Sequence, residues 1–310
     1  MPRMHRRAGG AALIVISALT LSACGAGSGD AAPQASAAAS TSQVALDQKL
    51  RDALPKEILD KGTLNATMVT FPPYINYKDD GKTLEGASVD LAEALSGLLG
   101  VKVKTEIVPA FSQAITGIQS GRYDFGLGPY ADNADTAKSF DFVDWIQEFV
   151  VFAVPKGNPA KIDSLESTCG HSIGVLGGGS AETVIQKYSA TCVSSGKSPV
   201  KVQSFQDVNG AILAVQSKRI EAYFSSQASL TYFMGKTGGA LELAGTGKAN
   251  GFDKLRQGSF FPKNSKLTDV LLDSLKKLQS DGTLSKIMGR WNLSGNELPD
   301  IGVNLGTAAS

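Results

Sequence analysis

The chain has 310 residues, 42% of them hydrophobic and 19% charged, which fits one large or two medium folded domains and excludes disorder throughout. The formal net charge is +1, and it includes Arg3, Arg6 and Arg7 of an N-terminal segment that we expect to be removed. Without them the charge is about −2, so nucleic acid is not an expected partner.

Residues 1–23 have the pattern of a signal peptide. A basic start precedes an apolar core from Ala11 to Leu19, and Leu21-Ser-Ala-Cys24 resembles the processing motif of bacterial lipoproteins. We expect cleavage before Cys24, lipidation of its thiol and export, with the acyl chains holding the protein at the outer face of the cytoplasmic membrane or in the periplasm. A plain signal peptide or a membrane anchor is the alternative, although the apolar core is shorter than the roughly 20 residues that span a bilayer.

Residues 24–49 follow as a tether. After the lipidated Cys24 they are mostly Ala, Ser, Gly, Gln and Pro, and such a composition buries too little apolar surface to order itself. We expect a flexible spacer between the membrane and the folded part.

Strand and helix patterns alternate from Leu50 to Asp144, which is typical of a parallel sheet with crossover helices. Phe71 and Tyr74 lie on a proline turn after the first strand, and Gly128-Pro129 is expected to end the third strand. Asp90 is placed to cap the second helix. The pattern predicts strands at Thr63–Val69, Val101–Val108 and Phe125–Leu127, a further strand before Asp144, and helices at Leu50–Asp60, Leu91–Leu99 and Phe111–Ser120.

A second part of the chain opens after the apolar run Phe149–Val154. A glycine-rich turn, Gly177-Gly-Gly-Ser180, precedes a helix, and free N–H groups at such a helix start suit an anion or a carbonyl oxygen. The chain is expected to cross back near Asn250–Gln257. The pattern predicts strands at Ser172–Leu176 and Arg219–Ser226, helices at Ala181–Tyr188 and Asp207–Ser217, and an amphipathic run at Leu267–Leu278.

Two motifs carry a family resemblance. Gln119-Ser-Gly-Arg-Tyr-Asp124 and Lys138-Ser-Phe-Asp-Phe-Val-Asp144 resemble the signature of family 3 extracellular solute-binding proteins, the ligand-capturing subunits of amino-acid-type ABC importers. The resemblance covers about Leu54 to Leu293, and at its end it implies that Trp291 packs the last helix onto the first lobe. It implies a two-lobed α/β fold of the periplasmic-binding-protein type II, in which each lobe is a mostly parallel sheet flanked by helices and two crossover strands join the lobes. The expected division is residues 50–155 and 251–298 for lobe 1, 156–250 for lobe 2, and 299–310 as a tail.

The resemblance also implies a function. The protein would capture a small polar ligand, an amino acid or a related compound, between its lobes and deliver it to the permease of an ABC transporter. We expect a monomer without cofactor, metal or nucleic acid, and no enzyme activity, since the sequence offers no evident nucleophile and base pair. The alternatives are a sensing module for a membrane receptor or kinase and, with less support, a periplasmic enzyme of the same fold.

The resemblance places the ligand among residues from both lobes. The family's carboxylate-binding Arg is replaced by Thr136 and its ammonium-binding Asp by Ser226, so we expect a polar ligand that is neutral or singly charged. Phe71, Tyr74, Ser180 and Ser226 could instead serve the core, a helix cap or a turn. Asp132 and Asp135 are expected to be solvated turn acids, with a cationic ligand as the alternative. The candidate ligand-binding residues are Phe71, Tyr74, Tyr130, Asn133, Thr136, Trp145, Gly179, Ser180 and Ser226.

Once Cys24 is lipidated, Cys169 and Cys192 remain. In an oxidising compartment two leftover cysteines are most simply a disulfide, and some members of the family carry a similar pair. Two buried free thiols, or a metal site that includes His171, are the alternatives.

Overall fold

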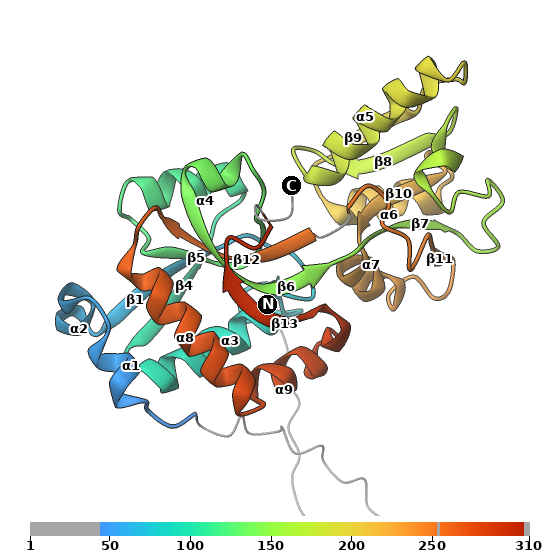
Figure 1. Ribbon diagram of the computed structural model, residues 1–310. Helices are drawn as coiled ribbons and strands as arrows, with labels where there is room; N and C mark the ends of the chain where they lie inside the picture. The colour runs from blue at the N-terminus through green and yellow to red at the C-terminus, as the bar shows by residue number, and fades with distance from the viewer. Residues whose placement is uncertain (1–43, 253–254, 307–310) are drawn as a thin grey trace, which may run out of the picture. The chain divides into compact units, whose positions relative to one another are not determined.

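The computed structural model describes residues 44–252 and 255–306. Two sheets with separate cores organise this part of the chain (Figure 1). The predicted signal peptide, Cys24 and most of the tether lie outside the described residues. Of the helices that are described, none combines the length and the apolar character that crossing a bilayer requires.

The first sheet has six strands in the order β13-β6-β12-β5-β1-β4. β1 pairs in parallel with β4 and β5, while β12 runs antiparallel to both β5 and β6. β6 therefore runs in the same direction as β5. The strands are β1 (Thr63–Met68), β4 (Lys102–Ile107), β5 (Phe125–Ala131), β6 (Phe140–Glu148), β12 (Leu255–Pro262) and β13 (Glu297–Val303).

Helices cover both faces of this sheet. α3, α8 and α9 pack on one face, and α4 packs on the other (Figure 1). A short hairpin, β2 (Asn76–Tyr77) and β3 (Leu84–Glu85), precedes α3. The helices are α1 (Gln48–Asp52), α2 (Lys56–Lys61), α3 (Ala87–Leu99), α4 (Phe111–Gln119), α8 (Lys266–Ser280), α9 (Thr283–Arg290) and the 3₁₀ turns η1 (Thr136–Lys138) and η3 (Ser294–Asn296).

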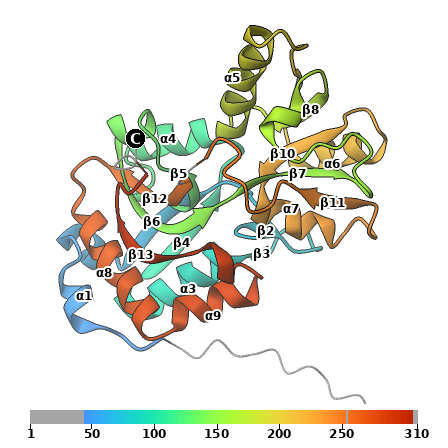
Figure 2. The ribbon, with the colours of Figure 1, turned by 45° about the vertical axis from the view of Figure 1, so that its right-hand side comes forward.

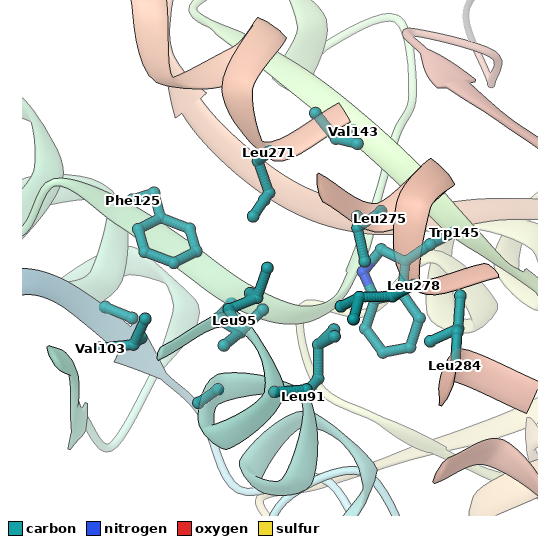
Figure 3. Packing of buried hydrophobic residues seen from close by; sticks show 14 of the residues in the cluster. Leu91, Leu95, Val103, Phe125, Val143, Trp145, Leu271, Leu275, Leu278 and Leu284 are labelled. Carbon is teal, nitrogen blue, oxygen red and sulfur yellow. The ribbon is translucent and has the colours of Figure 1, made fainter. Parts of the chain in front are cut away.

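The main core lies between the first sheet and α3, α8 and α9. Figure 3 shows Leu91 and Leu95 of α3 facing Leu275 of α8, with Trp145 of β6 beside them. Leu91 and Leu95 are one helical turn apart, so both fall on the helix face that turns toward the sheet. Trp145 and Leu275 have no exposed surface, and this core fixes β6, the strand that leads to the second sheet.

The second sheet has five strands in the order β11-β7-β10-β8-β9. β8, β9 and β10 are parallel, and β7 runs antiparallel to β10 and β11. The elements are β7 (Val150–Pro155), β8 (Ser172–Leu176), β9 (Lys201–Phe205), β10 (Ala222–Ser226), β11 (Leu241–Ala244), α5 (Ser180–Ser194), α6 (Val208–Gln216), α7 (Gln227–Met234) and the 3₁₀ turn η2 (Leu165–Thr168).

Alternation along the central strands of this sheet supplies its two faces with apolar side chains. Phe152 and Phe224 join the core under α5, and their neighbours Ala153 and Tyr223 join the core of α6 and α7. A strand buried on both sides reads as a continuous apolar run, as residues 150–154 do. The mixed α/β architecture and the parallel strands of both sheets confirm the predicted fold class.

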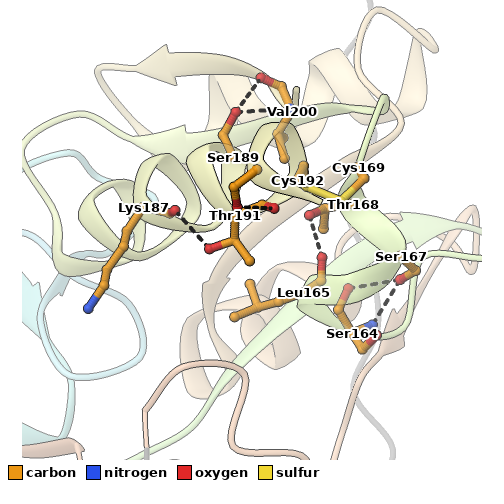
Figure 4. Close-up of a disulfide and its surroundings, with 11 residues drawn as sticks. Ser164, Leu165, Ser167, Thr168, Cys169, Lys187, Ser189, Thr191, Cys192 and Val200 are labelled. Atoms are coloured by element: carbon orange, nitrogen blue, oxygen red, sulfur yellow. Dashed lines mark hydrogen bonds between the residues drawn. A yellow bond between two sulfur atoms is a disulfide. The ribbon is translucent and has the colours of Figure 1, made fainter. Parts of the chain in front are cut away.

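A disulfide joins Cys169, directly after η2, to Cys192 in α5, with an S–S distance of 2.00 Å and a Cα–Cα distance of 5.7 Å (Figure 4). Cys192 has almost no exposed surface. Ser189 of the same helix bonds the backbone of Val200, because the N–H of Val200 donates to its hydroxyl at 3.0 Å. The predicted pairing is confirmed, and it fastens α5 to the segment that precedes β8.

The lobe boundaries differ from the expected ones. β7 pairs with β10 and β11, so the first crossing between the sheets falls at Phe149 and not at residue 155. β13 pairs with β6, so residues up to Val303 belong to the first sheet and are not a tail. Both differences have the same reason, since strand pairing decides which sheet a strand belongs to and the pattern of one strand does not reveal its partner.

The start of α3 also differs. The helix begins at Ala87 with Gly86 as N-cap, so the prediction that Asp90 caps it is wrong. Gly86 has φ +131°, and a Cβ there would lie 2.2 Å from the carbonyl oxygen of Tyr74, so only glycine fits. Asp90 instead accepts hydrogen bonds from Arg290 at 2.9 Å and from Nε1 of Trp291 at 2.8 Å. Trp291 thereby holds the end of α9 against α3.

Candidate functional site

The carboxyl ends of the strands in both sheets lie at the edges that Phe149 connects. β1, β5 and β6 end at one edge of the first sheet, and β6 passes through Phe149 into β7. In the second sheet Val150 at the start of β7 pairs with Ser226 at the end of β10. Because ligands of open α/β sheets bind at the carboxyl ends of strands, this junction is the candidate site.

Phe71 and Tyr74 occupy the turn after β1, which contains a cis peptide bond between Pro72 and Pro73. Phe71 is half-buried, whereas Tyr74 has no exposed surface and meets Trp145 edge-on, with ring centroids 6.2 Å apart. Tyr74 and Trp145 therefore lie in the core and are out of reach of a ligand in this conformation. Burial, followed by the nearby charge of Glu148, raises the pKa of Tyr74 well above its ordinary value.

Tyr130 lies inside β5, because the strand continues through Gly128-Pro129 to Ala131. The prediction that this dipeptide ends the strand is wrong. The pairing with β1 stops at Gly126, so the N–H that proline lacks is not needed on that side. The Tyr130 ring stacks on Phe111 at 5.3 Å and packs edge-on against Phe260 at 4.6 Å, and only 7% of the residue is exposed.

Asn133 and Thr136 close the turn after β5 with their own side chains. Oδ1 of Asn133 accepts from the N–H groups of Asp135 at 3.0 Å and Thr136 at 3.1 Å. The hydroxyl of Thr136 donates to the carbonyl oxygen of Ala131 at 3.1 Å. Asparagine commonly closes turns in this way. Lys138, the cation of this turn, pairs with Asp135 at 2.7 Å.

Two acids stand under this turn. Asp132 is 4% exposed and Asp144 has no exposed surface, so Asp132 is not the solvated turn acid that we expected. The N–H of Gly306 donates to Asp132 and the N–H of Leu305 to Asp144, both at 2.8 Å. Burial, and then the neighbouring Asp132 carboxyl, raise the pKa of Asp144 above its ordinary value. The segment after β13 thus covers both acids.

Gly179 and Ser180 begin α5. Gly179 is the N-cap, with no side-chain hydrogen bond, and Ser180 is the first helical residue, so Ser180 is not the cap. Glu182 was missed by the sequence analysis. One of its carboxylate oxygens accepts from the N–H of Gly178 at 2.8 Å, and the other accepts from the hydroxyl of Ser204. The Ser204 hydroxyl, and then the Gly178 N–H, lower the pKa of Glu182.

Ser226 caps α7, because its hydroxyl oxygen accepts from the N–H of Ser229 at 3.2 Å. Its own O–H donates to Glu148 at 2.7 Å. Glu148, at the end of β6, also accepts from the N–H of Phe149 at 2.8 Å and from Nδ2 of Asn296 at 3.3 Å. Burial raises the pKa of the Glu148 carboxyl to about 7. The carboxyl group of Glu148 is therefore bonded directly to the hydroxyl of Ser226.

The sequence analysis also missed Glu148 and Phe149 as site residues. The available signal was the position of Glu148, an acid directly before the apolar run Phe149–Val154. Phe149 is 42% exposed, which is unusual for an aromatic residue between two buried strands. Its exposure puts an aromatic side chain at the junction of the two sheets.

A side-chain contact between the two sheet units lies at the β2–β3 hairpin. Figure 2 shows this hairpin beside α7. Nδ2 of Asn76 in β2 donates to the hydroxyl of Tyr232 in α7 at 2.8 Å. Lys236 donates to the same hydroxyl at 2.8 Å, and its ammonium lies 4.5 Å from the centre of the Tyr232 ring. The hairpin after β1 and the helix after β10 are thus bonded to each other.

Comparisons with known proteins agree with this arrangement. The family model for bacterial extracellular solute-binding proteins, family 3, matches residues 65–294. The arginine-binding protein ArgT of Corynebacterium glutamicum is 25% identical over 258 residues, 83% of this chain and 83% of that protein. The L-cystine-binding protein TcyJ of Escherichia coli is 25% identical over 244 residues, 77% and 86% of the two chains.

Among solved structures, an ancestral arginine-binding protein bound to arginine is 29% identical and has a TM-score of 0.64, covering 74% of this chain and 98% of its own. The three relatives are binding proteins by name, and the family inferred from the sequence motifs is confirmed. The chain belongs to the family 3 bacterial extracellular solute-binding proteins.

Proposed function

We propose that this protein captures an amino acid or an amino-acid-related compound at the junction around Phe149 and delivers it to an ABC transporter permease. The observation that carries the proposal is the meeting of the strand ends of both sheets at that junction. Relatives named for arginine and for cystine support an amino-acid-type ligand.

The binding step is a closure of the two sheet units about their connections. One connection is the single residue Phe149, and the other runs from β11 to β12. A ligand held by one unit favours closure only through the further contacts that the other unit adds. The permease then distinguishes the liganded from the unliganded form by this closure.

The residues that we propose for ligand contact come from both units. Phe71 and Phe149 offer exposed aromatic surface, and Ser180 offers a backbone N–H group without an acceptor inside the helix. Ser226 offers a hydroxyl oxygen. Asn133, Thr136 and Gly179 shape the turns that carry these groups, whereas Tyr74, Tyr130 and Trp145 support them from the core.

The remaining parts of the proposal concern the setting of the protein. Export, lipidation of Cys24 and residence at the outer face of the cytoplasmic membrane follow from the N-terminal motif. We propose a monomeric binding protein that performs no catalysis and needs no cofactor.

Isothermal titration calorimetry of the purified protein against free amino acids, their amides and their decarboxylated amines tests this function. We expect at least one compound to bind with a micromolar or lower Kd, and Phe149→Ala to weaken that binding about tenfold, since a lost aromatic contact costs roughly 1–2 kcal/mol. Leu213→Ala is the matched control, because Leu213 is an exposed apolar residue of α6. The absence of binding by every compound would refute the proposal.

A further inference from the structure

The residues that follow β13 return to the first sheet. Asn304 turns the chain with φ +54°, a conformation that asparagine adopts more readily than most residues. Its N–H donates to the carbonyl oxygen of Phe142 at 3.0 Å, and its Oδ1 accepts from the N–H of Phe142 at 2.9 Å. Its Nδ2 donates to Asp141 at 3.1 Å. We call residues Asn304–Gly306 the strap, and these bonds fasten its start to β6.

The end of the strap lies on two buried acids. The N–H of Leu305 donates to Asp144 and the N–H of Gly306 to Asp132, both at 2.8 Å. Asp144 belongs to β6, whereas Asp132 follows β5, and β12 lies between these two strands in the sheet. The strap therefore crosses β12 and links β6 to the end of β5.

The two acids favour this attachment. The pKa of Asp144 is raised to about 8, chiefly by burial and then by the neighbouring Asp132 carboxyl, although the N–H of Leu305 and the charge of Arg256 act in the opposite direction. A buried carboxyl group is costly without hydrogen-bond donors. Each acid receives one donor from the strap, and the same bonds hold the strap to the sheet.

Two glycines give the strap its close fit. A Cβ on Gly306 would lie 2.2 Å from the carbonyl oxygen of Asp132, and a Cβ on Gly302 would lie 2.9 Å from the Leu305 side chain. No side chain fits at either position without a shift of the strap. On its other side Asp132 is held by β12, because its N–H donates to the carbonyl oxygen of Arg256 at 3.1 Å. Asp132 is thus fixed between β12 and the strap.

Asp132 directly precedes the turn Asn133–Thr136, which we proposed to shape the ligand site. The side-chain hydrogen bonds of this turn and of Lys138 stay within residues 131–138. These bonds shape the turn, but they do not join it to other parts of the described chain. The place of the turn over the sheet therefore depends on its two ends, and the strap fixes the first end through Asp132.

We infer that the strap positions the turn Asn133–Thr136 for ligand binding, so that Asn304 and Gly306, although far from this turn in the sequence, contribute to affinity. This inference rests on the proposed function, because it adds positioning residues to the same site. A turn released by the strap would have to be ordered again when the ligand binds, and that loss of conformational freedom weakens binding.

Isothermal titration calorimetry with the purified protein measures this contribution. The probe is L-arginine or, where another free amino acid, amide or decarboxylated amine binds the wild type more tightly, that compound. Gly306→Ala should weaken binding about tenfold, because its Cβ cannot lie so close to Asp132 and lifts the strap. Gly295→Ala is the matched control, since a Cβ has open space there, and its Kd should stay within about twofold of the wild type.

Asn304→Gly tests the other end of the strap. Glycine keeps the positive φ but loses the side-chain bonds to Phe142 and Asp141, so we expect weaker binding here as well. Leu271→Ala separates positioning from stability. Leu271 is a buried core residue of α8, and its loss should destabilise the protein while the Kd stays within about twofold of the wild type.

Hydrogen exchange followed by mass spectrometry observes the turn directly. Peptides that cover residues 131–137 should exchange at least about threefold faster in Gly306→Ala than in Gly295→Ala, because the N–H of Asp132 loses its fixed place. Unchanged exchange in this turn, or an affinity of Gly306→Ala equal to that of the wild type, would overturn the inference and leave the proposed function intact. So would a Kd that rises equally in Leu271→Ala. A wild type that binds none of these compounds would overturn the proposed function, and the inference with it.

Discussion

Replacing Glu148 by glutamine should change how the stability of the protein depends on pH. Glu148 is 4% exposed and accepts hydrogen bonds from Ser226, Phe149 and Asn296. Burial is the largest influence on this carboxyl and raises its pKa from 4.5 to about 7. Glutamine has nearly the same shape and keeps one oxygen for the donors of Phe149 and Asn296, but it carries no charge at any pH.

The magnitude follows from the two pKa values. A raised pKa means that the folded protein binds the proton more tightly than the unfolded chain does, so the stabilisation is complete below about pH 4.5 and is lost as the pH rises through about 7. The difference of about 2.5 pKa units corresponds to about 3 kcal/mol of unfolding free energy. The raised pKa of Asp144 acts in the same direction, so the wild type should lose stability between pH 5 and pH 8.

Urea unfolding followed by circular dichroism at pH 5, 6, 7 and 8 measures this loss. We expect Glu148→Gln to lose about 2.5 kcal/mol less than the wild type across this range, because part of the full effect falls below pH 5. The control is Glu93→Gln, since Glu93 is an exposed acid of α3, and it should follow the wild type. Parallel pH profiles for the wild type and Glu148→Gln would show that the carboxyl ionises as it would in water, and the argument from its burial would fail.

Three further predictions concern stability and are tested by the same unfolding measurement at pH 7. Replacing Cys169 and Cys192 together by alanine should lower the unfolding free energy by about 3 kcal/mol, because the disulfide closes a loop between residues 23 positions apart; an unchanged value would mean that the chain-entropy argument does not apply. Gly258→Ala should lower the unfolding free energy by more than about 2 kcal/mol, since its Cβ would lie 2.0 Å from a backbone oxygen of β6. The control Gly295→Ala has open space around the new Cβ and should cost less than about 1 kcal/mol. Equal costs for the two variants would contradict the close packing at Gly258. Leu275→Ala should cost about 2–5 kcal/mol as a fully buried core deletion, and a cost below about 1 kcal/mol would mean that the core collapses around the gap.

The order of strands and helices could be predicted because it depends on local patterns. Alternation at Thr63–Val69, helical spacing of Leu91, Leu95 and Leu98, and turns at glycine and proline are all visible in a single sequence. The predicted element boundaries were wrong where contacts between distant parts of the chain determine the local structure. β5 can continue through Gly128-Pro129 because its pairing with β1 ends at Gly126, so the N–H that proline lacks is not needed there. The N-cap of α3 is Gly86, where the nearby backbone of Tyr74 leaves no room for a side chain.

The junction itself was predictable in position but not in chemistry. The motifs placed Thr136, Ser180 and Ser226 at strand ends and helix starts, where the structure has them. The sequence could not show that the hydroxyl groups of Thr136 and Ser226 are hydrogen-bonded to neighbouring residues. It also could not show that Glu148 is buried next to Ser226, because that contact joins residues far apart in the chain. The hydrogen bond of Glu182 could have been predicted, since a glutamate in the first turn of a helix often accepts from the backbone of the preceding turn.

The backbone donors of Leu305 and Gly306 have a practical consequence for anyone who labels or shortens this protein. A chain cut after Val303 would leave Asp132 and Asp144 without these two N–H groups. Because the Leu305 N–H favours the charged form of Asp144, its loss would raise the pKa of this carboxyl further, at the edge where the ligand is proposed to bind. A fluorescent reporter is therefore better placed on an exposed helix position such as Leu213, where a dye can follow binding without loosening the site.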